Sequence, residues 1–156
     1  MLVLVVGIVA FVLVRDLNRD TPGSPVAAVD YARTAAYAQE RASFEVLAPE
    51  ALPKGWKATT VGFVPDPSRW HLGVLTDQGN YVGLEQAESS VASMVSTYVD
   101  RETTRGKPVT IDGETWASRS DTGGDTALVR RAGDVTTLVV TTDDVDLLVD
   151  YINSLR

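Results

Sequence analysis

The sequence predicts an α+β fold built on a mainly antiparallel sheet of about six to seven strands. Three turn sequences carry this prediction, because each separates two runs of strand-forming residues: DQGN at 77–80, DG at 112–113 and AGD at 132–134. Two segments with helical periodicity, 91–99 and 145–152, follow strands instead of alternating with them. We therefore expect two amphipathic helices on one face of the sheet, and an N-terminal membrane helix before it.

The N-terminal prediction rests on an unbroken apolar run over residues 1–14. As a helix this run would rise about 21 Å, which is short of the roughly 30 Å hydrocarbon core of a bilayer. A cleavable signal peptide would add a basic n-region and a small-residue cleavage site, and neither is present. We expect a transmembrane signal anchor whose beginning lies upstream of Met1. The alternative is a buried N-terminal helix or strand of the fold.

Residues 15–43 are expected to form a juxtamembrane linker and a helix. The stretch 15–25 is polar and rich in Pro and Gly, whereas the Ala-rich stretch 27–41 predicts a helix. Its apolar stripe is weak. The charges at 15–20 cancel, so the positive-inside rule gives little orientation. Because the N-terminal side is short, we favour placing the C-terminal domain, 44–156, outside the cytoplasm. The apolar stripe of the helix expected at 27–41 comprises Val29, Ala32, Ala36 and Tyr37.

The first half of the domain is predicted to hold four strands. A short strand begins at Phe44, a Pro-bounded turn follows at 53–55, and a second strand covers 57–64. Strands 70–76 and 81–86 then form a hairpin. Alternation places His71 and Leu75 on the face opposite the apolar set, and no partner is expected for His71. The apolar set comprises Trp70, Leu72, Val74, Val82 and Leu84.

The second half adds two helices and two hairpins. A Ser89 or Ser90 cap starts the helix at 91–99. The Asp112-Gly113 turn pairs Val109 with Trp116 and makes both core residues together with Ile111. The last hairpin turns at 132–134, and Thr142 is the expected cap of the last helix. The two helical stripes comprise Val91, Met94, Val95, Tyr98 and Val99, and Val145, Leu148, Val149 and Ile152.

Five short motifs follow one another along the chain in a recognisable order. They are F-x-V-x-x-P-x-x-L-P-x-G-W at 44–56, W-x-x-G at 70–73, Y-V-x-L-x-Q at 81–86, G-x-x-W at 113–116, and a helix ending in Ser154-Leu155. Behind a hydrophobic N-terminus, this pattern resembles the actinobacterial domain-of-unknown-function family 4245. The resemblance implies a single-pass, membrane-anchored extracytoplasmic domain and brings no catalytic residues. The chain lacks the longer basic N-terminal region expected of the family, which agrees with an upstream start.

Composition excludes several chemistries. A net charge of −7 and scattered basic residues argue against nucleic acid as a partner. The chain has no Cys and one His, so the usual zinc sites and a cysteine nucleophile are excluded. No G-x-S-x-G motif accompanies His71. We therefore expect no metal, no cofactor and no catalysis. The acidic residues Asp121, Asp125 and Asp143 leave a carboxylate-based hydrolase as an alternative.

The leading functional prediction is a non-catalytic binding or scaffolding domain of the cell envelope, anchored in the cell membrane, with an envelope protein or lipid as partner. A second prediction is a carrier or sensor of a hydrophobic envelope ligand such as lipid. The three tryptophans are either core anchors or the lining of an apolar groove, and Trp56 is the one we expect to be partly exposed. The candidate ligand-binding residues are Trp56, His71 and Leu75.

Overall fold

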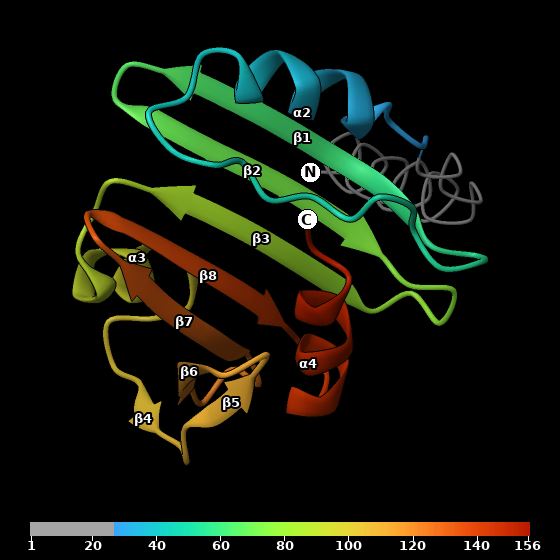
Figure 1. Cartoon of the computed structure of the whole chain (residues 1–156). Helices are drawn as coiled ribbons and strands as arrows, with labels where there is room; N and C mark the ends of the chain where they lie inside the picture. The colour runs from blue at the N-terminus through green and yellow to red at the C-terminus, as the bar shows by residue number, and fades with distance from the viewer. Residues whose placement is uncertain (1–26) are drawn as a thin grey trace, which may run out of the picture.

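Within residues 27–156, eight strands form one antiparallel sheet, and three helices pack against it (Figure 1). The computed structural model describes residues 27–156, so the expected membrane segment and the linker up to residue 26 lie outside the described residues. Within that described part, no helix has the length and hydropathy needed to span a bilayer. The helices are α2 (Tyr31–Gln39), α3 (Val91–Tyr98) and α4 (Val145–Asn153).

The strand order across the sheet is β1-β2-β3-β8-β7-β6-β4, and the short β5 pairs with β6. Two meanders, β1–β3 and β6–β8, are therefore joined at the centre by β3 and β8. This confirms the α+β fold with a mainly antiparallel sheet, with more strands than the expected six to seven. The strands are β1 (Lys57–Pro65), β2 (Ser68–Leu75), β3 (Tyr81–Ala87), β4 (Thr104–Arg105), β5 (Val109–Ile111), β6 (Glu114–Ser120), β7 (Thr126–Ala132) and β8 (Val135–Thr141).

The predicted hairpins are confirmed in position and register. Asp112 and Gly113 have φ of 50° and 81°, the left-handed pair that a type I′ turn requires, and Val109 lies opposite Trp116. In the β2–β3 hairpin, Leu72 lies opposite Leu84 and Val74 opposite Val82. Local turn chemistry and alternation thus define most strand pairs.

The helices do not share one face, so that prediction is wrong. Helix α4 packs on the face that carries Trp70 and Leu84, which we call the α4 face. Helix α3 covers the other side, the α3 face, where Met94 contacts the cluster around Leu138. The reason is that β7 and β8 are apolar on both sides, as strands buried on both faces are, and each side needs its own cover.

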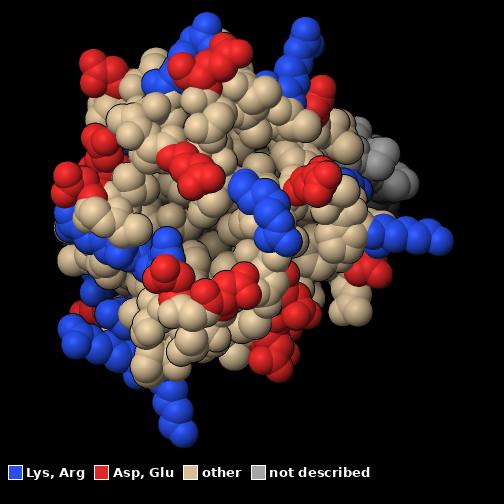
Figure 2. Space-filling model, in the orientation of Figure 1, with Lys and Arg blue, Asp and Glu red and all other residues tan. Residues whose placement is uncertain are grey.

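Acidic and basic side chains are interspersed over the face seen in Figure 2.

The segment before β1 departs from the predictions. No strand forms at Phe44, because side chains satisfy the backbone there: Gln39 accepts from the Val46 N–H and Gln86 accepts from the Leu47 N–H. Helix α2 is shorter than expected, and it turns Tyr31, Ala35 and Ala38 toward the core. The expected stripe members Ala32, Ala36 and Tyr37 are exposed.

The predicted N-terminal cap is confirmed for helix α3 and wrong for helix α4. The Ser90 side chain caps α3 by accepting from the Ser93 N–H, as predicted. Helix α4 is capped by Asp144 instead of Thr142, since the Asp144 carboxylate accepts from the backbone N–H groups of Asp146 and Leu147. A carboxylate at this position also suits the positive end of the helix dipole.

Candidate functional site

The three predicted ligand-binding residues do not come together. Trp56 is half-buried on the α4 face, where its ring stacks on Tyr151 at 6.3 Å between centroids and 15° between planes. His71 and Leu75 lie on the α3 face of β2, since they alternate with Trp70, Leu72 and Val74. Trp56 therefore cannot share a ligand site with His71.

The other two tryptophans are core residues. Trp70 is 1% exposed, and its indole N–H donates to the Leu47 carbonyl oxygen at 2.9 Å. Trp116 is also buried, and the Arg130 guanidinium lies 5.7 Å from the centroid of its ring. These contacts support the core interpretation of both residues, and Trp56 is the partly exposed one as predicted.

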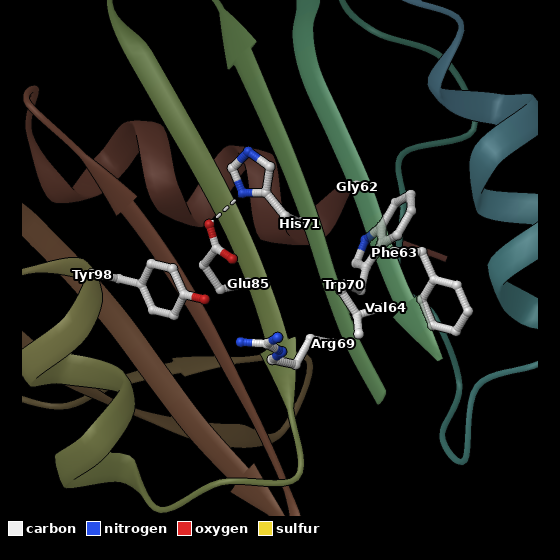
Figure 3. Close-up of a pocket in the computed structure, with 8 residues that line it drawn as sticks. All are labelled: Gly62, Phe63, Val64, Arg69, Trp70, His71, Glu85 and Tyr98. Atoms are coloured by element: carbon white, nitrogen blue, oxygen red, sulfur yellow. Dashed lines mark hydrogen bonds and ion pairs between the residues drawn. The ribbon is translucent and has the colours of Figure 1, made fainter. Parts of the chain in front are cut away.

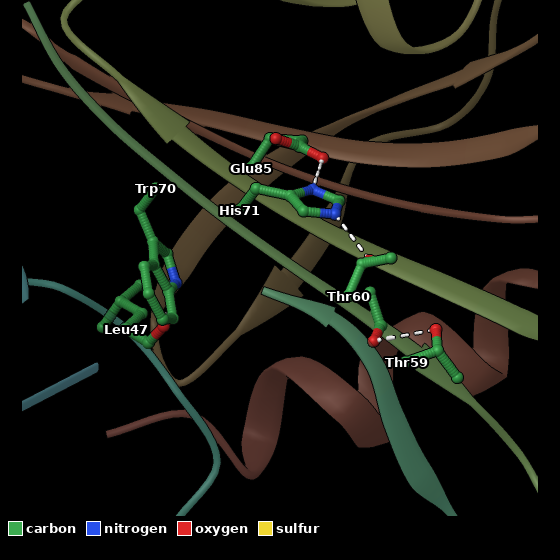
Figure 4. Close-up of polar contacts among 7 residues, drawn as sticks. Leu47, Thr59, Thr60, Trp70, His71 and Glu85 are labelled. Carbon is green, nitrogen blue, oxygen red and sulfur yellow. Dashed lines mark hydrogen bonds and ion pairs between the residues drawn. The ribbon is translucent and has the colours of Figure 1, made fainter. Parts of the chain in front are cut away.

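The chemistry of the α3 face centres on His71 and Glu85, which lie directly opposite each other on β2 and β3. His71 Nδ1 and Glu85 Oε1 are 2.5 Å apart, so the imidazole N–H donates to the carboxylate (Figure 4). The Glu85 side chain is only 5% exposed, whereas that of His71 is 35% exposed. A buried carboxylate is costly unless it is paired, and His71 supplies the pair from the solvent side.

Thr60 completes a row of three polar side chains. Its Oγ1 lies 2.8 Å from His71 Nε2 (Figure 4). A neutral imidazole that donates to Glu85 accepts from this hydroxyl, whereas the imidazolium donates to it. A β-bulge shifts the register between Ala58 and Thr60. Because one extra residue turns a strand over, the bulge places Thr60 on the same face as His71.

This hydroxyl–imidazole–carboxylate order is the one found in catalytic triads. The imidazole can take a proton from Thr60 while Glu85 stabilises the imidazolium. This alignment is not sufficient for hydrolysis. In acyl-transfer enzymes, hydrogen-bond donors aimed at the developing oxyanion supply the largest share of the rate enhancement. The arrangement equally holds a donor and acceptor set in fixed positions for a bound ligand.

The electrostatics of the pair favour the charged imidazole. The hydrogen bond to Glu85 raises the pKa of His71, and this effect outweighs partial burial, which acts in the opposite direction. Burial raises the pKa of Tyr98, the charge of Glu85 raises it further, and Arg69 opposes this. Burial followed by the charge of Glu85 also raises the pKa of Tyr81. The negative charge of Glu85 thus acts on all three neighbouring groups, His71, Tyr81 and Tyr98.

A recess of about 340 Å³ opens over His71, Glu85, Arg69 and Tyr98. Figure 3 shows Tyr98 reaching toward Glu85 from α3, with Arg69 beside them and Val64 on the β1 side. A Cβ added at Gly62 would meet nothing within 4 Å, so the space above β1 is open. Helix α3 covers the β7–β8 side of this face, and the recess lies where that cover ends.

The expectation that His71 has no partner is wrong. The strand sequence YVGLEQA held the missing information, because Glu85 is its single charged residue and a charge within a core strand needs a partner. In the observed register Leu72 pairs with Leu84, and this pairing places His71 directly opposite Glu85. Thr60 could not be found in this way, since nothing in the strand sequence marks the bulge.

The acidic residues have local structural partners. Asp121 accepts from the Asp125 N–H at 2.8 Å, and burial raises the pKa of Asp125, as does the nearby charge of Asp121. Asp143 accepts from the Asn80 amide. Among residues 27–156, no group of three or more His, Asp or Glu side chains is arranged to hold a metal ion.

Comparison with known proteins identifies the family. No curated protein and no solved structure matches the chain. A family model described as "Protein of unknown function (DUF4245)" matches residues 1–155. The match covers nearly the whole chain and includes the five motifs over residues 44–155. The chain therefore belongs to the DUF4245 family of proteins of unknown function.

Proposed function

We propose that this chain is a membrane-anchored domain that binds a polar ligand outside the cytoplasm without turning it over. The observation that carries the proposal is the buried Glu85 carboxylate, paired with His71 on the floor of an open recess. The apolar run at residues 1–14 supports the anchor. The partner is an envelope protein or lipid that offers a polar group to the recess.

Stability alone gives little reason for the pair. Replacing a buried ion pair by apolar residues of similar size is often neutral or stabilising. In this protein the pair lies beside Arg69 and the Tyr98 hydroxyl, at the point where the cover of the sheet ends. Charged groups gathered in a recess, with shifted pKa values, are typical of binding and catalytic sites.

The same lining favours a polar ligand group over an acyl chain. The centre of the recess is formed by an ion pair, and Val64 and Gly62 supply apolar surface toward its β1 side. A ligand that carries a polar head and a small apolar part would match both regions. The hydrophobic carrier remains the second candidate, restricted by this geometry to ligands whose polar head enters the recess.

The single histidine makes the binding proposal directly measurable. In the ¹⁵N-labelled full chain in nonionic detergent, the imidazole resonances belong to His71 alone. We expect at least one class of probe, drawn from small carboxylates, primary ammonium compounds and N-acetylated dipeptide amides, to shift them saturably. Glu85→Gln should abolish the shift, because it removes the charge that orients the ring. Asp121→Asn, a carboxylate change outside the recess, should leave it intact.

Two results would contradict this proposal. One is that no probe moves the His71 resonances. The other is hydrolysis of p-nitrophenyl acetate by the wild-type chain at a rate that Thr60→Val abolishes, because Thr60 contributes only its hydroxyl to the row of three. That second result would establish catalysis by Thr60, His71 and Glu85 in place of binding.

The anchor has its own test. Arg156 is exposed at the end of the described chain, so a reporter fused after it would not enter the core. We expect an alkaline phosphatase fusion to be active, because this enzyme folds only after export. A fluorescent reporter that matures only in the cytoplasm should stay dark at the same position. Activity restricted to the cytoplasmic reporter would rule out the proposed orientation.

A further inference from the structure

A second cleft also lies on the α3 face, toward the β4 edge of the sheet, whereas the recess lies toward the β1 edge. Its volume is about 490 Å³, and it shares no lining residue with the recess. Helix α3 forms one wall through Val91 and Val95, and the turn after α3 together with β4 and β6 forms the rest. Figure 1 shows α3 and β4 on the same side of the sheet, far from β1.

Three arginines line this cleft: Arg101, Arg105 and Arg119. Arg105 and Arg119 lie directly opposite each other on β4 and β6. Like charges in directly opposed positions destabilise a strand pair, so this placement calls for a compensating anion. Within residues 27–156, none of the three arginines forms an ion pair with a carboxylate.

Acidic residues of the cleft do not supply that anion. Asp100 and Glu102 lie in the lining, but the Asp100 carboxylate accepts from the Glu102 backbone N–H at 2.8 Å and so serves the turn. Arg119 is half-buried, and its Nη1 donates to the Ser118 carbonyl oxygen at 2.7 Å. This contact holds one end of the guanidinium and leaves its other N–H groups for a ligand. The cleft thus holds three arginines against two carboxylates, in a chain of net charge −7.

We propose that the cleft between α3 and β4 binds a phosphate group through Arg105 and Arg119, with Arg101 at the rim. Guanidinium groups recognise phosphate through paired N–H donors, and two of them side by side can grip different oxygens of one group. Bound phosphate would also remove the repulsion between the opposed arginines. The phosphate comes either from a soluble ion or ester or from a phospholipid headgroup.

The test uses the full chain in nonionic detergent at constant ionic strength, with chloride as the reference anion. We expect inorganic phosphate to raise the thermal unfolding midpoint saturably. The double variant Arg105→Gln/Arg119→Gln should weaken the apparent affinity by at least about tenfold, since two charge-assisted contacts are lost. The matched control Arg33→Gln/Arg41→Gln removes the same charge from the α2 region and should bind phosphate as the wild type does.

A second arm identifies the source of the phosphate. Dihexanoyl phosphatidylglycerol that binds more tightly than inorganic phosphate, in an Arg105- and Arg119-dependent way, would assign the cleft to a lipid headgroup; the reverse order would assign it to a soluble phosphate. Equal phosphate binding by wild type and the Arg105→Gln/Arg119→Gln variant would overturn the proposal, as would the absence of any shift with phosphate. The His71 resonances report the other recess, so failure here leaves the binding proposal for His71 and Glu85 intact.

Discussion

Replacing Trp70 by alanine is expected to lower the free energy of unfolding by about 3–5 kcal/mol, the largest effect we predict for a single substitution. Trp70 is 1% exposed and belongs to the core between the sheet and α4. The change leaves a large cavity and also removes the donor to the Leu47 carbonyl. Urea unfolding followed by far-UV circular dichroism measures the loss.

Two control variants separate packing from hydrogen bonding. Trp70→Phe keeps much of the aromatic volume but loses the indole N–H, so we expect a loss of about 1–2 kcal/mol. Trp56→Ala removes a half-buried ring and should lower stability less than Trp70→Ala does. Equal losses for the two alanine variants would contradict the placement of Trp70 at the centre of the core.

The second large effect concerns the His71–Glu85 pair. His71→Ala leaves the Glu85 carboxylate buried without its partner, and we expect a loss of about 1–3 kcal/mol near pH 6. The estimate is below the range for fully buried pairs because His71 is partly exposed and water can replace it. The double variant His71→Leu/Glu85→Leu should be close to the wild type, since it removes both charges together.

This effect should depend on pH in a defined direction. The pKa of His71 is raised in the folded state, so the folded protein holds the imidazole proton more tightly than the unfolded chain does. The resulting stabilisation is fully present below the unfolded value of about 6.5, and it is lost as the pH rises through the folded pKa. Urea unfolding of the wild type and His71→Ala at pH 5.5, 7 and 8.5 should show a shrinking difference. A difference that grows with pH would contradict the assigned pair.

The sequence was most informative where structure depends on neighbouring residues. The Asp112-Gly113 turn fixes its hairpin because few residue pairs adopt two consecutive left-handed conformations. Alternation along β2 and β3 identified Trp70 and Leu84 as core residues on a common face. These features depend on local geometry, so one sequence is enough to predict them.

Long-range features were harder to predict. The side of the sheet that α3 covers depends on which face is already filled by α4 and the segment before β1, and helical periodicity does not report this. The bulge that brings Thr60 to His71 depends on how β1 pairs with β2. The two-residue strand β4, which places Arg105 beside Arg119, is too short to show a pattern.

The central pairing of β3 with β8 has a consequence for how the chain folds. Hairpins β2–β3 and β7–β8 close over short turns, whereas Val82 pairs with Thr141 across most of the C-terminal half of the chain. Closing so long a loop costs more chain entropy than closing a hairpin, and contacts between distant residues slow folding. The two meanders can therefore form early as separate units. Their joining along β3 and β8 is the step expected to limit the rate at which this protein reaches its native state.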